Sequence, residues 1–132
     1  MSSKEKPSLL FVIHSLVVGG TENLVFQIAK QLRDEYRIGI CCLDKKGTIW
    51  DLAEQEGFDL FLLNRQPGFS FSCLTGLRTV YKNFNPDIVH AHQYSPFFYS
   101  SLAKMSSLRK PRLIFTEHGR HFPDLVLSLI HI

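Results

Sequence analysis

Residues 9–32, LLFVIHSLVVGGTENLVFQIAKQL, decide the fold of this chain. The segment opens on a continuous apolar run, Leu9–Ile13, which is typical of a strand buried on both faces of a sheet. Two glycines follow, and apolar residues then recur at the spacing of an amphipathic helix, for which we predict Thr21 as the N-cap. A buried strand joined to a helix in this way is the opening unit of a parallel α/β sheet.

The same alternation of strand and helix continues along the chain. Four more strands are predicted, at residues 36–43, 59–63, 88–91 and 112–116. Helical patterns separate them, one capped by Thr48 and another opened by Ser95 and Pro96. The predicted fold class is therefore α/β, a Rossmann-like parallel sheet with helices on both faces. We expect a disordered tail at residues 1–7, one incomplete domain at 8–124, and a truncated or non-native tail at 125–132.

Composition narrows the class of protein. Among 132 residues, 15 Lys and Arg stand against 12 Asp and Glu, a net charge of +3 without a dense basic stripe, so nucleic acid is not an expected partner. No apolar run approaches the ~20 residues of a membrane span, and no secretory signal is evident. The three cysteines have no CxxC spacing, which favours buried free thiols in a reducing compartment. We expect a cytoplasmic protein, with peripheral contact at the inner face of the membrane as an option.

Histidines follow three of the predicted strands. His14 comes after the first strand, His90 and His92 close the fourth, and His118 and His121 follow the fifth. In open parallel sheets, ligands bind outside the carboxyl ends of the strands. The sequence therefore predicts that the ends of strands one, four and five meet along one rim.

The turn after the first strand suits a phosphate group. Gly19 and Gly20 lead into a helix N-terminus, where unpaired N–H groups attract a diphosphate, although the same pair fits an ordinary tight turn. The third glycine of the dinucleotide fingerprint is absent. Asp44, at the end of strand two, has the position of a ribose-binding carboxylate, but a solvated loop aspartate is the favoured interpretation.

The later histidines allow two kinds of chemistry. His90 and His92 lie two residues apart and share a strand face, so with His118 they are candidate metal ligands or packed strand-end histidines. His118 neighbours Glu117 and Arg120, and these groups suit sugar hydroxyls and phosphate, although a solvated polar loop is the alternative.

Three motifs together resemble family 4 glycosyltransferases. They are the opening strand with GGTE at residues 19–22, PDIVHAH at 86–92 and TEHG at 116–119, in the family's order, and the likeness extends from about residue 8 to 124. Within the family, residues 39–43 and 63–68 look closest to enzymes of bacterial surface polysaccharide biosynthesis.

The resemblance implies the amino-terminal, acceptor-side half of a GT-B enzyme. Such an enzyme transfers a sugar from a nucleotide-diphosphate sugar to a glycan or lipid-linked acceptor with retention, without a metal or other cofactor. Gly19 and Gly20 match the loop that approaches the donor diphosphate, and His118 matches the histidine beside the donor sugar. The other candidates would line the cleft and contact substrate: His14, His90, His92, Glu117 and Arg120. The partner would be a carboxy-terminal Rossmann-like domain, without which we expect no activity.

Two other classes of function stay open. A metal-dependent hydrolase would use the cluster of His90, His92 and His118. A non-catalytic nucleotide-binding module would need only the glycine turn. Among the aromatic residues, Phe97–Tyr99 could touch a lipid or a sugar ring, but core packing of their helix is favoured.

Overall fold

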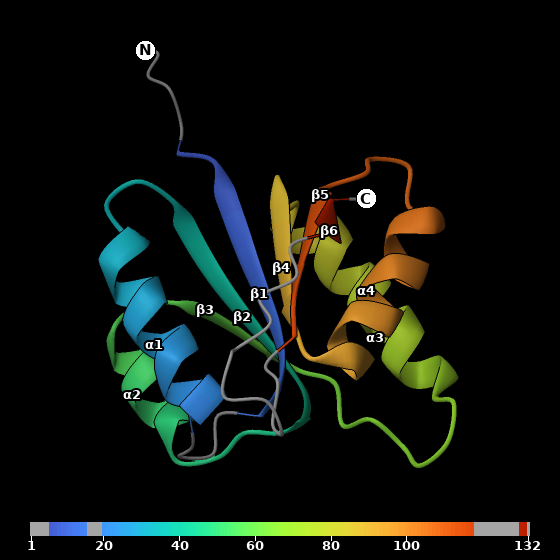
Figure 1. Cartoon of the computed structure of the whole chain (residues 1–132), viewed down its shortest axis with the longest axis horizontal. Coiled ribbons are helices and arrows are strands. Elements are labelled where there is room, and N and C mark those ends of the chain that lie inside the picture. Colours follow the sequence, from blue (N-terminus) through green and yellow to red (C-terminus); the bar gives the residue numbers. More distant parts are fainter. Residues whose placement is uncertain (1–5, 16–19, 118–129, 132) are drawn as a thin grey trace.

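One sheet of six strands organises the molecule (Figure 1). The computed structural model describes residues 6–15, 20–117 and 130–131. In spatial order the strands are β3 (Asp59–Leu62), β2 (Arg37–Lys45), β1 (Ser8–Ser15), β4 (Ile88–His92), β5 (Arg112–Thr116) and β6 (Ile130–His131). Strands β1 to β5 are all parallel, which confirms the predicted Rossmann-like sheet. Strand β6 was not predicted, and it pairs antiparallel with β5.

Helices cover both faces of the sheet, as predicted. Helices α1 (Gly20–Leu32) and α2 (Ile49–Gln55) pack on one face, and α3 (Phe71–Phe84) and α4 (Tyr94–Met105) pack on the other (Figure 1). Within the described part of the chain, no helix combines the length and the apolar character needed to cross a membrane.

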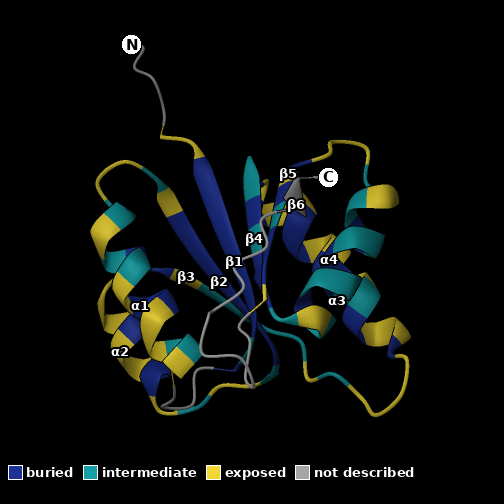
Figure 2. Ribbon diagram, in the orientation of Figure 1, coloured by how far each residue is buried: buried dark blue, intermediate teal, exposed yellow. Residues whose placement is uncertain are grey.

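The apolar strand residues divide between two cores because successive side chains point to opposite faces. Phe11 packs toward α1 and α2, whereas its neighbour Leu10 packs toward α3 and α4. Figure 2 shows the central strands buried along most of their length. Cys41 and Cys42 also lie on opposite faces, and with Cys73 they are buried free thiols, as predicted. Burial raises the pKa of Cys42 to about 12 and that of Cys73 to about 11.

Two predicted helix caps were wrong, and one cap was missed. Helix α1 begins at Gly20, so Thr21 lies inside its first turn, and α4 begins at Tyr94, so Ser95 does too. The turn into α4 is made by Gln93, whose φ of 76° few residues other than glycine adopt. The side chain of Ser70 caps α3 by accepting a hydrogen bond from the Cys73 N–H at 3.1 Å.

The expected tails fall mostly beyond what the structure describes. Residues 1–5, 125–129 and 132 lie outside the described residues, so those boundaries stay predictions. Residues 6–7 lie within them, and the Pro7 carbonyl accepts a hydrogen bond from the Arg37 N–H at 2.9 Å.

Candidate functional site

The order of the strands sets the place of the site. Strand β1 lies between β2 and β4. From β1 the chain first forms β2 and β3 on one side of it, and then forms β4 and β5 on its other side. Such a reversal opens a crevice at the carboxyl ends of the two central strands. The carboxyl ends of β1, β4 and β5 are therefore neighbours along one rim, as the distribution of histidines predicted.

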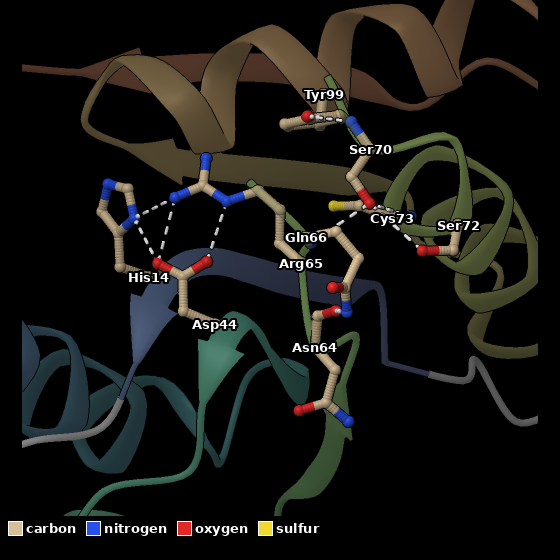
Figure 3. Close-up of polar contacts among 9 residues, drawn as sticks. All are labelled: His14, Asp44, Asn64, Arg65, Gln66, Ser70, Ser72, Cys73 and Tyr99. Carbon is tan, nitrogen blue, oxygen red and sulfur yellow. Dashed lines mark hydrogen bonds and ion pairs between the residues drawn. The ribbon is translucent and has the colours of Figure 1, made fainter. Parts of the chain in front are cut away.

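A polar cluster occupies the ends of β1, β2 and β3 (Figure 3). Asp44 accepts two hydrogen bonds from Arg65, from Nε at 2.8 Å and from Nη2 at 3.1 Å. The same carboxylate lies 3.1 Å from Nδ1 of His14. All three side chains are partly buried, with exposed fractions of 36% for His14, 34% for Asp44 and 21% for Arg65. Asp44 is therefore an ion-paired residue of β2, and its interpretation as a solvated loop aspartate was wrong.

The cluster orients two groups toward a ligand. Nδ1 of His14 lies 3.1 Å from Asp44 and also 3.5 Å from Nη2 of Arg65, and in the tautomer with the proton on Nδ1 the ring donates to the carboxylate. That tautomer leaves Nε2 as an acceptor, and Figure 3 shows this atom on the far side of the ring from Asp44. Nη1 of Arg65 also points away from the carboxylate, and none of the described residues hydrogen bonds to it. Arg65 can therefore hold Asp44 and an anionic ligand at once.

Backbone bonds fix the loop that carries Arg65. The Arg65 N–H donates to the Leu43 carbonyl at 2.7 Å, which extends the pairing beyond the end of β3. Further along, the Gln66 N–H donates to Ser70 Oγ at 3.3 Å, and the Ser70 N–H donates to the Tyr99 hydroxyl at 2.9 Å. The loop is thus attached both to β2 and to α4.

The second group of predicted residues lies at the ends of β4 and β5. His90 and His92 share a strand face, with ring centroids 4.2 Å apart, and both rings pack on Phe11. Nε2 of His90 lies 2.8 Å from Oγ1 of Thr116, so the ring is tied to the last residue of β5. Glu117 follows directly and is exposed.

The turn before α1 is described only from Gly20 onward. Gly20 is exposed and opens the helix, and a Cβ built on it would meet none of the described residues within 4 Å. A helix N-terminus that begins with glycine suits an anionic ligand, because the backbone N–H groups can be approached closely. Gly19, His118 and Arg120 lie outside the described residues, as does His121, so their predicted roles stay predictions.

The metal-site alternative also stays a prediction. Within the residues that the structure describes, no three His, Cys, Asp or Glu side chains gather closely enough to hold a metal ion. The third proposed ligand, His118, is not among those residues.

Sequence reasoning missed Arg65 and Thr116. Arg65 appeared only within residues 63–68, and Thr116 only as the last residue of a predicted strand and the first of the TEHG motif, so neither was a candidate site residue. A signal was available, because Asp44 and Arg65 both come at the ends of successive strands and carry opposite charge. Placing them side by side requires the strand order, which residue patterns did not give.

The strand order and the helices on both faces define a Rossmann-like domain. The family model for Glycosyltransferase Family 4 matches residues 18–131 of the chain. The chain belongs to this family, and its domain is that of a glycosyltransferase. No curated protein matches the sequence.

Proposed function

We propose that the chain is the amino-terminal, acceptor-side domain of a retaining glycosyltransferase of hexosyltransferase type. The enzyme would move a sugar from a nucleotide-diphosphate sugar to a glycan or lipid-linked acceptor in surface polysaccharide biosynthesis. The shared rim of β1, β4 and β5 is the observation that supports this proposal. The three motifs that resemble family 4 glycosyltransferases come at or just after the carboxyl ends of these strands. A second Rossmann-like domain would be the partner that binds the donor nucleotide.

The rim offers different groups to the two substrates. The N-terminus of α1 at Gly20 would approach the donor diphosphate and stabilise its growing negative charge. His118 would contact the donor sugar near the reacting carbon, beside Glu117 and Arg120. His90, which is partly buried, would form part of the wall of the cleft, whereas the His92 side chain is buried, with only 1% exposed.

The polar cluster would receive the acceptor. Nε2 of His14, oriented by Asp44, can accept a hydrogen bond from the attacking hydroxyl and hold it in place. This transfer needs positioning and charge stabilisation rather than a cofactor. We expect the reaction at the cytoplasmic side, with peripheral contact at the membrane.

A comparison of sugar transfer by the chain alone and by a two-domain protein tests the proposal. The 132-residue chain and a protein joining it to a second Rossmann-like domain would be incubated with UDP- and GDP-sugars and a sugar acceptor. We expect transfer only by the joined protein, with retained anomeric configuration by proton NMR and no loss on adding EDTA. Transfer by the chain alone, or an inverted product, would contradict the proposed division of labour. Loss of activity in EDTA with recovery on adding zinc would favour a metal-dependent enzyme.

A further inference from the structure

Beside Arg65 lies an exposed cluster of aromatic rings. We define the aromatic patch as Phe69, Phe71, Tyr94 and Phe98, which come from the loop before α3 and from the first turns of α3 and α4. Three of them are exposed, with fractions of 46% for Phe69, 73% for Phe71 and 64% for Tyr94. Contiguous exposed apolar groups of this kind mark binding sites in soluble proteins.

The rings of the patch form one continuous surface. Phe69 lies against Phe71 with centroids 4.7 Å apart and against Phe98 at 6.1 Å. Tyr94 stacks on Phe98, also at 6.1 Å. Tyr99, which is buried, stacks under Phe69 at 5.6 Å and lies 6.0 Å from the guanidinium carbon of Arg65. The buried ring of Tyr99 therefore connects Phe69 of the patch to Arg65 of the polar cluster.

The patch is held in place rather than carried on a loose loop. Ser70, between the two phenylalanines, caps α3 and donates its N–H to the Tyr99 hydroxyl. A ligand that binds these rings would not have to order them first, which favours affinity. Folding alone does not account for a phenylalanine that stays mostly in water, as Phe71 does.

The charge beside the patch favours an anion. Nη1 of Arg65 has no partner among the described residues, and the guanidinium suits phosphate geometry. Helices α3 and α4 both begin at this edge of the sheet, so the partial positive charge of two N-termini adds to that of Arg65. An anionic group at the rim would thus lie next to apolar rings.

We propose that the acceptor is a sugar linked to a lipid phosphate, whose phosphate binds Arg65, whose apolar chain lies on the aromatic patch and whose sugar supplies the attacking hydroxyl. This inference rests on the proposed function, because it names the substrate class of the acceptor side. A neutral glycan would use the rings but not the guanidinium, and a soluble sugar phosphate would use the guanidinium but not Phe71.

Calorimetric titration of the 132-residue chain tests this, with farnesyl phosphate as the probe. Farnesol lacks the phosphate and glucose 1-phosphate lacks the lipid, so both should bind at least about tenfold more weakly. Phe71→Ala should weaken farnesyl phosphate about tenfold, because the ring loses its apolar contact. Met105→Ala is the matched control, since Met105 is equally exposed, at 72%, but sits at the other end of α4. It should leave affinity unchanged.

Arg65→Gln separates the two halves of the site. It should weaken farnesyl phosphate about 30-fold and leave farnesol unaffected. Circular dichroism and urea denaturation would confirm that each variant is folded. Equal affinity of Phe71→Ala and wild type, equal affinity for farnesol and its phosphate, or no binding at all would overturn the proposal.

Two comparisons identify the alternative occupants. Tighter binding of glucose 1-phosphate than of farnesyl phosphate would assign the rim to a soluble acceptor. Phe71-dependent binding to phosphatidylglycerol vesicles, without binding of farnesyl phosphate in solution, would make the patch a membrane contact. In either case, transfer to a soluble acceptor by the joined enzyme would still support the proposed function, so the two failures are distinguishable.

Discussion

The ion pair between Asp44 and Arg65 should be worth more than an ordinary surface pair, and a double-mutant cycle can measure this. Asp44 accepts from two nitrogens of one guanidinium, at 2.8 and 3.1 Å, and the Arg65 side chain is only 21% exposed. Exposed ion pairs contribute ~0.2–1 kcal/mol and charged hydrogen bonds ~1.5–3 kcal/mol. Partial burial and double contact place this pair between them, so we expect a coupling of about 1.5 kcal/mol.

The assay is urea denaturation of the wild type, Asp44→Ala, Arg65→Ala and the double variant. Arg37 and Asp59 form a matched control pair of the same residue types, joined by one contact at 3.2 Å and about half exposed. Their coupling should stay below about 0.5 kcal/mol. A coupling for Asp44 and Arg65 as small as that of the control would refute the claim that Asp44 fixes the guanidinium.

Other contacts give tests of stability and chemistry. Gly39→Ala places a Cβ 2.9 Å from the ring of Phe84, so urea denaturation should show a loss of ~1–3 kcal/mol, and an unchanged midpoint would mean that the ring moves aside freely. Gly20→Ala meets none of the described residues within 4 Å, so stability should not fall, while transfer by the joined enzyme should, because the methyl group would keep the diphosphate from the helix N-terminus; full activity would contradict the diphosphate role. The hydrogen bond from the Ser8 N–H holds the pKa of Asp87 below its usual range. A carboxyl with a lowered pKa stabilises the fold fully above its ordinary pKa of ~4 and loses this as pH falls through the lowered value. Asp87→Ala should therefore cost ~1 kcal/mol at pH 7 and less as the pH falls below ~4, and a loss independent of pH would contradict this. Burial raises the pKa of all three thiols, so Ellman's reagent at pH 8 should label them only after urea unfolds the chain, and labelling of the native protein would show that they are accessible.

The sheet could be predicted because its signals are local. The run Leu9–Ile13 is apolar on both faces, and β1 is buried on both faces. The burial of this strand could therefore be predicted from its own residues. Helix starts were harder to place. Gln93 turns the chain with a positive φ that its side chain does not favour, so the tertiary contacts at the end of β4 decide where α4 begins.

The site was harder to predict because it depends on contacts between distant segments. Core packing was favoured for Phe97–Tyr99, and Tyr99 is indeed buried, yet Phe98 belongs to the exposed patch through its contact with Phe69. Nothing in the sequence near Phe69 or Phe71 distinguishes an exposed ring from a buried one. Their exposure follows from the position of the loop between β3 and α3, which the hydrogen bond to Tyr99 sets.

The candidate site residues at the rim lie on two different faces of the sheet. His90 and His92 pack with Phe11 on the face of α1, while Arg65 lies near Tyr99, which packs on the face of α3 and α4. Sugar transfer needs two substrates whose reacting atoms meet although their bound parts stay separate. A donor held near α1 and an acceptor held by α3 and α4 would approach from opposite faces and meet only at the end of β1. Variants of Arg65 should therefore change the KM for the acceptor and leave the KM for the donor unchanged, and steady-state kinetics of the joined enzyme can measure both. An equal rise in the two constants would mean that one surface binds both substrates.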